Sequence, residues 1–563
     1  MSNLIDLLRR VRGELTPLGR LSRAALQLRT PMRDNDDSDD EAVEADFNRI
    51  QDLLRKRLEL LQMTVENDKG VEKTLDNNMN KNDRKQYEAE KLNKARIKLE
   101  ATLPNEIINS LQQLRTDVLT TLREILLAHL YQVLVLKLVV VWNEEHMDTP
   151  GYVSDVEVEK LIKVLLDGDY RTDVELYYLV RLVVALIVLD IDEFGTFVNP
   201  QLLQTFQKLV TEGSGSVVTA ENKATIVNGL VNMTLVLHHG LLNFGLDDTA
   251  KWLMDLAEGF ATSAFNLRSQ LSLGDREYST LITDKHLDDK LVLEAVLKVN
   301  GELAVAVAAL HGLATVLTLL SRGEYLNELV EDFMLKLVPL VDNDADAEIA
   351  KAAARVVAVI YEVYTYGEDD DDADDDEYNT NAPYYEQEQL FAIFDRLANL
   401  LTKKVLKKDR KLVHSVFRNI LNLMKAYTNP VTRAELLKRL PEGMEIINAL
   451  FPNVTLRLSK YKLWPIDTWG MYLRLRSLKW CFLFGLHHQL VALESLRDIL
   501  KDDVGHHRHL EIDELRLDDT AYTDLVDDAL SKMNEMNDKQ RAEKRRRDRD
   551  NKFHENMGDF ADD

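Results

Sequence analysis

The residues of this chain best suited to chemistry form a dense cluster of cations near its C-terminal end. The cluster follows an acidic stretch, Asp513–Asp528, and includes KRRR at Lys544–Arg547. Each Lys or Arg can neutralise a phosphate and release its counterion, so this density favours contact with a nucleic-acid backbone. The candidate RNA-binding residues are Lys539, Arg541, Lys544, Arg545, Arg546, Arg547, Arg549 and Lys552.

The same run has two other interpretations. It contains no Gly or Pro, and Glu543, Asp548 and Asp550 interleave with the cations, which fits a solvated helix with internal ion pairs. The KRRR sequence also fits a nuclear localisation signal. Contact with nucleic acid is the interpretation that the cation density favours, and it predicts a basic terminal helix.

Residues that could catalyse a reaction are scarce. GSGS at Gly213–Ser216 lacks both the Lys-Ser/Thr pair and the preceding strand of a phosphate-binding loop. The single cysteine, Cys481, lies in the apolar segment KWCFLFG, where a thiol is hard to ionise. It is predicted to be a buried structural cysteine in a protein of a reducing compartment. We therefore predict no catalytic residues and no enzymatic activity.

Histidines occur in adjacent pairs, and one pair belongs to HHRH at His506–His509. Imidazoles are common metal ligands. However, adjacent histidines on a helix point apart, and no Cys or ordered acids accompany them. The sequence therefore predicts neither a metal site nor a cofactor.

The composition indicates a helical scaffold behind these residues. The chain has 563 residues, a net charge of −26 and 45% hydrophobic residues, with only 22 glycines and 11 prolines. Few turn-forming residues favour helices over a turn-rich β protein. The longest apolar stretch, Ile125–Trp142, is interrupted by His129 and Lys137, so we expect a core helix there and no membrane span.

Apolar segments of helix length follow one another from Pro104 onward, and Asn, Asp and Gly recur at the breaks. The predicted helices are a first one from Phe47, then Ser110–Asn143, Val153–Leu166 with Ser154 as N-cap, Val174–Val188, Pro200–Thr211, Thr219–Leu242, Asp247–Phe265, His286–Leu320, Tyr325–Val341 and Asp346–Tyr364. Pairs of roughly forty residues are typical of armadillo/HEAT-like arrays, which we favour over an irregular all-α domain.

Two charged segments flank this series. Residues 1–33 form a basic amphipathic arm, followed by the acidic linker Asp34–Asp46. The arm resembles a transit peptide in composition, but its early Asp6 and Glu14 favour an arm that contacts a partner. Glu368–Glu377 reads EDDDDADDDE, a self-repelling run that stays solvated and marks a boundary.

Beyond that boundary, Leu412–Leu500 mixes aromatic and basic residues, including Trp464, Trp469 and Trp480. Such aromatics form either a core or a binding surface. Both are satisfied if the tryptophans point inward and the Lys and Arg side chains point outward.

This block carries motifs that resemble those of the interferon-related developmental regulator family. SVFRNILNLM at Ser415–Met424 is similar to the family's S-V-F-R-D-V-L-R through Phe417 and Arg418, with Asn419 in place of the acid. IDTWGMYLRL resembles the family's D-S-W segment through Asp467 and Trp469.

Two further segments extend the resemblance. GLHHQLVALESLRDIL is similar to a family block ending in E-L-L-R-D-I-F, with Gln489 where a His is expected. The matching positions are Gly485, Leu490, Glu494, Arg497 and Asp498. The closing Gly558-Asp559-Phe560 resembles the family's terminal Gly-Glu-Phe, with Phe560 matching. The helices before the acidic run resemble the family's repeat unit, so the resemblance extends from about residue 100 to the tail.

The resemblance implies an armadillo-like domain, a small C-terminal domain and no enzymatic activity. It implies a regulator that binds ribosomes, with the basic C-terminal helix in tRNA-binding space, and represses translation. The alternative is a nuclear transcriptional co-regulator whose helical array binds proteins. The expected partners are ribosomal RNA and ribosomal proteins or, for the alternative, co-regulator proteins. We expect a monomer without small-molecule substrate, cytoplasmic in the first case and nuclear in the second.

The expected organisation is all-α. It comprises a largely disordered basic arm and acidic linker at 1–46, an armadillo-like array at 47–366, an acidic disordered linker at 367–385, a helical region with the family motifs at 386–510, and an acidic then basic helix or tail at 511–563.

Overall fold

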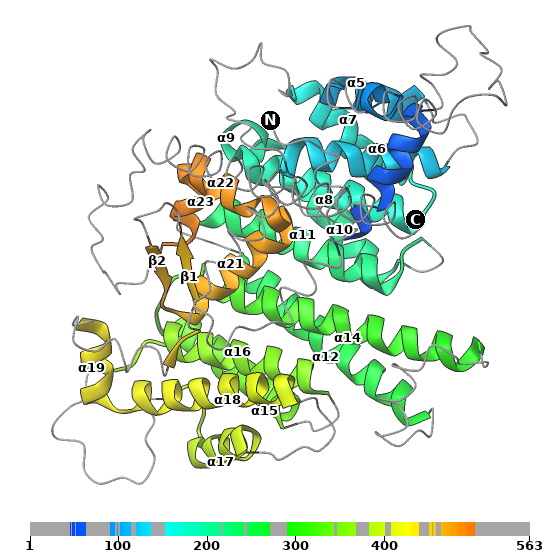
Figure 1. Ribbon diagram of the computed structural model, residues 1–563. Helices are drawn as coiled ribbons and strands as arrows, with labels where there is room; N and C mark the ends of the chain where they lie inside the picture. Colours follow the sequence, from blue (N-terminus) through cyan, green and yellow to red (C-terminus); the bar gives the residue numbers. More distant parts are fainter. Residues whose placement is uncertain are drawn as a thin grey trace, which may run out of the picture.

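The computed structural model describes a helical protein between residues 46 and 501 (Figure 1). The described residues are 46–62, 91–113, 120–136, 153–270, 290–367, 382–438 and 450–501, with shorter gaps at 47, 51, 96–97, 100–101, 214–216, 241–244, 343–345, 400–406, 453 and 458–462. The predicted basic arm, the acidic run Glu368–Glu377 and the tail at 511–563 lie outside them.

The helices before the acidic run follow the predicted series closely. They are α5 (Pro104–Gln113), α6 (Thr120–Tyr131), α7 (Asp155–Leu166), α8 (Asp173–Leu189), α9 (Ile191–Phe194), α10 (Pro200–Thr211), α11 (Ala220–His238), α12 (Leu246–Gln270), α14 (Lys290–Leu317), α15 (Glu324–Val341) and α16 (Ala347–Val363). The all-α fold class is confirmed, whereas its assignment to the armadillo/HEAT type stays a prediction.

Capping side chains explain where these helices begin. Ser154 and Glu157 form a capping box before α7, as the sequence predicted for Ser154. Four other helices start after a side chain that accepts a hydrogen bond from the first turn: Thr172 before α8, Asn199 before α10, Thr219 before α11 and Asp346 before α16. These short polar side chains satisfy N–H groups that have no partner within the helix.

The long helical region predicted over Ser110–Asn143 is helical throughout its described part. The described part of this region contains α5, α6 and a π-helical turn, η2 (Gln132–Leu136). The Val135 carbonyl oxygen in this turn accepts a hydrogen bond from Nε2 of Gln489, 3.4 Å away. The widened turn therefore meets a segment far along the chain, which the local hydrophobic pattern could not indicate.

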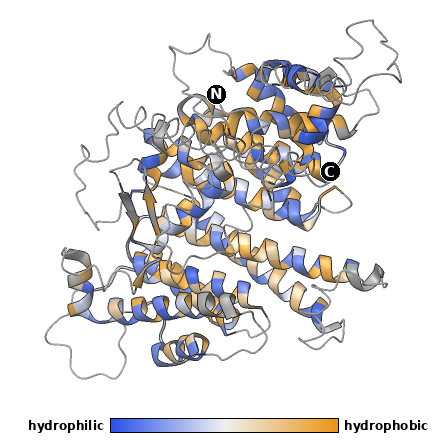
Figure 2. Ribbon diagram, in the orientation of Figure 1, coloured by the Kyte–Doolittle hydropathy of each residue, from blue (hydrophilic) through white to orange (hydrophobic). Residues whose placement is uncertain are grey.

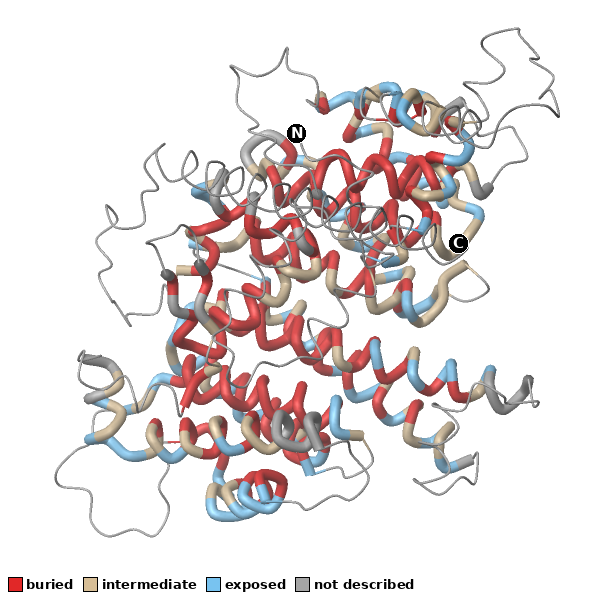
Figure 3. The backbone as a smooth tube through the Cα atoms, in the orientation of Figure 1, coloured by how far each residue is buried: buried red, intermediate tan, exposed pale blue. Residues whose placement is uncertain are grey.

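The core runs through the middle of the helical stack. Helices α8, α11, α14 and α16 lie inside it and are buried over most of their length, as the red segments of Figure 3 show. Helix α14 packs against α11, α12 and α16. The segment Glu294–Leu317 of α14 is long and apolar enough to cross a membrane, but 67% of its most apolar window is buried inside the protein. It is therefore a core helix.

The region after the acidic run adds more helices and one hairpin. Its elements are α17 (Gln387–Asn399), α18 (Lys407–Thr428), α19 (Pro430–Lys438), β1 (Val454–Arg457), β2 (Leu463–Ile466), α21 (Trp469–Phe482), the short 3₁₀ turn η6 (Leu483–Gly485), α22 (Leu486–Ala492) and α23 (Glu494–Ile499). Polar and apolar residues alternate along α18, which lies on the edge of the stack (Figure 2).

The antiparallel hairpin of β1 and β2 is an addition that the sequence did not predict. Leu456 pairs with Trp464, and both side chains are buried. Each strand has only four residues, and β2 contains Pro465, which cannot donate a ladder hydrogen bond. Strands this short carry little periodic signal.

The C-terminal block joins the core of the array. Helix α21 packs against α8, α11, α14 and α16, and α18 packs against α16. The expectation of inward tryptophans holds for Trp464 and Trp469, which are buried. The expectation of outward cations is wrong for Arg474, which is 2% exposed because carbonyl groups surround its guanidinium. The predicted domain boundaries themselves stay predictions.

Candidate functional site

The predicted RNA-binding residues are not among those that the structure describes. Lys539 to Lys552 all follow residue 501, the last described position, and so does Phe560. Their assignment therefore remains a prediction. The other motif positions are described, and they lie in α18 and around α21.

Phe417 and Arg418 are adjacent in α18 and differ completely in burial. Phe417 is 1% exposed, and its ring meets that of Phe394 on α17 edge to face, with 5.9 Å between centroids. This contact fixes α18 on α17. The Arg418 side chain is exposed. One motif position thus serves packing, while the next faces the solvent.

Trp469 is the first residue of α21, and a carboxylate from α16 accepts hydrogen bonds from the backbone at this helix start. The backbone N–H groups of Trp469 and Gly470 donate to the two carboxylate oxygens of Glu362, at 2.7 and 3.0 Å. Glu362 is only 5% exposed. An anion at a helix N-terminus meets both free N–H groups and the positive end of the helix dipole. Thr468 completes the cap, because its side chain accepts from the Met471 N–H at 3.0 Å.

Three further features fix the surroundings of this end of α21. The indole N–H of Trp469 donates to the Leu450 carbonyl at 3.1 Å. Asp467, the other motif position here, is buried. A Cβ at Gly470 would meet Cγ2 of Thr318 at 3.0 Å, so glycine permits the close approach of α21 to the end of α14.

Arg474 ties α21 to both α14 and α23. Its Nε and one terminal nitrogen donate to the side-chain and backbone oxygens of Thr318, each at 3.0 Å. Its other terminal nitrogen donates to the carbonyls of Ile499 and Lys501, at 3.2 and 3.0 Å. Carbonyl groups at helix ends lack partners within the helix, and the planar guanidinium satisfies several of them at once.

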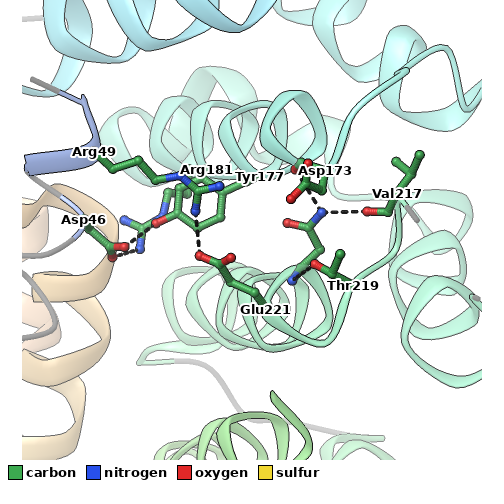
Figure 4. A network of polar contacts seen from close by, with 9 residues as sticks. Asp46, Arg49, Asp173, Tyr177, Arg181, Val217, Thr219 and Glu221 are labelled. Carbon is green, nitrogen blue, oxygen red and sulfur yellow. Dashed lines mark hydrogen bonds and ion pairs between the residues drawn. The ribbon is translucent and has the colours of Figure 1, made fainter. Parts of the chain in front are cut away.

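Arg181 of α8 holds the other end of α21. It donates to the Trp480 carbonyl at 2.9 Å, and its guanidinium carbon lies 4.6 Å from the centroid of the Trp480 ring. The same guanidinium pairs with Asp46, which also accepts from the Tyr177 hydroxyl at 2.6 Å (Figure 4). Burial alone would lower the pKa of Arg181, but Asp46 and neighbouring tyrosines raise it above its ordinary value.

The polar network continues along α11 (Figure 4). Arg49 pairs with Glu221 at 2.6 Å and lies over the ring of Tyr177, 4.7 Å from its centroid. Asn222 donates to the backbone carbonyls of Asp173 and Val217. The helix that contains Asp46 and Arg49 is thereby fastened to α8 and α11.

The predicted burial of Cys481 is confirmed. The Cys481 carbonyl accepts a hydrogen bond from the Tyr131 hydroxyl on α6. Burial raises the pKa of the Cys481 thiol well above its ordinary range, so the thiolate that a nucleophile needs is suppressed.

The last motif positions lie in α22 and α23. Gly485 is buried at the start of α22, and Arg497 is 7% exposed and donates to the Leu490 carbonyl at 2.8 Å. Burial lowers the pKa of Arg497. Glu494 is exposed, and Asp498 is half-buried and pairs with Lys501. These residues lie in the last described helices, before the predicted tail.

Metal ligands do not converge in the part of the chain that the structure describes. No group of three or more His, Cys, Asp or Glu residues there could hold a metal ion. The HHRH segment at His506–His509 lies outside the described residues.

Of the described motif residues, Trp469 takes part in a docking seam that holds α21 on the array. We define the seam as the contacts of α21 with Glu362, Thr318 and Arg181. Sequence reasoning identified Trp469 but missed all three of these partners. They carry no local signal, because each lies more than a hundred residues from its partner in α21.

Comparison with known proteins agrees with the sequence motifs. The family model described as Interferon-related developmental regulator matches residues 287–425. This stretch begins just before α14 and ends within α18, and it includes Phe417 and Arg418. No curated protein matches the chain. This match supports the resemblance of residues 287–425 to the interferon-related developmental regulator family.

Proposed function

We propose that this protein is a non-enzymatic regulator that binds ribosomes and represses translation. Its basic C-terminal residues contact ribosomal RNA in tRNA-binding space. The observation that carries the proposal is the density of positive charge: eight Lys and Arg residues lie between Lys539 and Lys552. Such a segment neutralises phosphates without reading base sequence, as RNA recognition by shape and backbone requires.

A contact of α21 holds the last described residues that precede this segment. Arg474 holds the carbonyls of Ile499 and Lys501, the latter being the last described residue. The last described residues before the basic segment are therefore held in place by α21.

The remaining parts of the proposal concern the scaffold and its surroundings. We infer that the helical array is of the armadillo type and docks on the outside of the ribosome, where ribosomal proteins and RNA are both accessible. The protein acts as a monomer in the cytoplasm. The mechanism needs no cofactor or small-molecule substrate, because positioning and charge alone block the tRNA site.

The test is co-sedimentation of the full chain with purified ribosomes at several salt concentrations. Replacing Arg545, Arg546 and Arg547 by Glu should weaken binding at every concentration. Each lost phosphate contact should also lower the salt slope by about one, hence by about three in total. The intact chain should repress translation in a cell-free extract, and the triple variant should repress it less.

A matched control inverts three cations that lie exposed on other helices of the described region. They are Lys56, Lys163 and Lys298. This control changes net charge by the same amount and should leave sedimentation unchanged. If the tail variant pellets as well as the control does, the proposal is wrong. If the intact protein stays at the top of the gradient and accumulates in nuclei, the nuclear co-regulator is the better reading.

A further inference from the structure

Helix α18 carries a row of basic positions at helical spacing. Lys407, Lys411, His414, Arg418 and Lys425 follow one another at intervals of three, four or seven residues. Positions three, four and seven apart lie on the same side of a helix. The row therefore occupies one face, which we call the basic face of α18.

Packing directs this face outward. The opposite face is buried, with Phe417, Ile420, Leu421 and Met424 each no more than 5% exposed. These residues are on the side where α18 meets α16 and α17. Helix α18 lies at the edge of the stack, with its neighbour α17 alongside (Figure 1).

Two cations on the basic face are described and exposed, namely Arg418 and Lys425. They lie seven residues apart, or about 10 Å along the helix axis. Lys425 is 5.9 Å from the centroid of the Phe391 ring on α17, so its position is partly fixed. His414, at the edge of the same face, contacts the Leu397 carbonyl through Nδ1 at 3.0 Å.

Arg418 differs from the other arginines that the structure describes in this block. Arg474, Arg433 and Arg497 each donate to backbone carbonyls. Within the described residues, Arg418 has neither a hydrogen bond nor an ion pair. Its guanidinium therefore stabilises no described contact. Arg418 nevertheless lies inside the stretch that the family model matches.

The exposed cations of the basic face favour a polyanion as its ligand. An exposed guanidinium and an exposed ammonium, whose helix positions are about 10 Å apart, can each bind a separate phosphate. Helix α17 beside them exposes Glu388 and Asp395, so the surroundings are mixed in sign. Such a face holds a regular phosphate backbone by a few contacts and gains from counterion release.

We propose that the basic face of α18 binds the phosphate backbone of RNA and forms a second RNA contact, separate from the tail. That this RNA is ribosomal rests on the function proposed above. The two contacts belong to one chain. Binding at one contact then raises the effective concentration of the other.

The test uses the full chain and purified ribosomal RNA, with ribosomes as a second binding partner. The variant replaces Arg418 and Lys425 by Glu, and the control replaces Lys163 and Lys298 by Glu. All four side chains are exposed, so the variants should fold, which circular dichroism verifies. We expect RNA affinity to fall about tenfold and the salt slope to drop by about two in the α18 variant alone.

Combination with the tail variant separates this inference from the proposed function. If the α18 variant behaves like its control, the inference is overturned, whatever the tail variant does. If the α18 variant weakens RNA binding while the tail variant does not, the inference stands and the tail mechanism fails. Loss of ribosome binding with unchanged affinity for purified RNA would assign the face to a ribosomal protein and also overturn the inference.

Discussion

At the residue scale, Glu362 is the acid on which the start of α21 depends. Its two oxygens accept from Trp469 and Gly470 inside a site that excludes water. Replacing Glu362 by Gln keeps the shape but removes the charge and turns one acceptor into a donor that faces an N–H group. The free energy of unfolding should fall by about 1–3 kcal/mol, measured by denaturant titration.

A control at the surface isolates the effect of burial. Glu388 on α17 is exposed, and its replacement by Gln should change stability by less than about 0.5 kcal/mol. Equal stabilities of the two variants would show that the Glu362 carboxylate does not hold the helix.

Residues differ in how far their roles can be read from sequence. Trp469 was expected to be buried because a tryptophan in a helical block usually packs in a core. Arg474 was expected at the surface because burial of a guanidinium is costly unless acceptors converge on it. Those acceptors come from Thr318, Ile499 and Lys501, and only the tertiary structure brings them together.

At the scale of elements, the crossing of α14 and α11 depends on a glycine. A Cβ at Gly312 would lie 2.5 Å from Cγ2 of Val231, closer than atoms of packed side chains can approach. Replacing Gly312 by Ala should therefore destabilise the protein by about 1–3 kcal/mol in a thermal or denaturant melt, although Ala is the better helix former.

Gly259 on α12 supplies the opposite case. It is exposed, and a Cβ there would meet nothing within 4 Å. Ala at this position should stabilise the protein by up to about 1 kcal/mol through helix propensity. If both substitutions stabilise, the helices are farther apart than the structure shows, and the packing explanation is wrong.

Most helices could be predicted because their ends and periods are local. Thr219, Asn199 and Ser154 cap helices whose starts the sequence placed within two residues. The π-helical turn within Ser110–Asn143 and the β1–β2 hairpin were missed for a different reason. The π-helical turn meets a distant partner, Gln489, and each strand of the hairpin has only four residues, so no local pattern encodes either feature.

At the scale of the whole molecule, the docking seam makes the array and the C-terminal block one core. Buried residues from α6 to α23 belong to a single hydrophobic cluster. If α21 became exposed, Glu362 would lose the N–H donors of Trp469 and Gly470, and Arg181 would lose the Trp480 carbonyl. Losing such partners is costly for buried charged groups. Neither part is therefore expected to unfold while the other stays folded.

This coupling predicts one unfolding transition for the described residues. Three of the five tryptophans, Trp464, Trp469 and Trp480, lie in the C-terminal block, so fluorescence reports on this block once Trp142 and Trp252 are replaced by Phe. Far-ultraviolet circular dichroism is instead dominated by the helices of the array. The two signals should change at the same denaturant concentration, as a two-state transition requires. Replacing Arg474 by Ala should shift both midpoints together, because the seam couples them. A fluorescence transition that precedes the helical one would instead show that the C-terminal block is a separate folding unit, and the coupling assigned to the seam would be wrong.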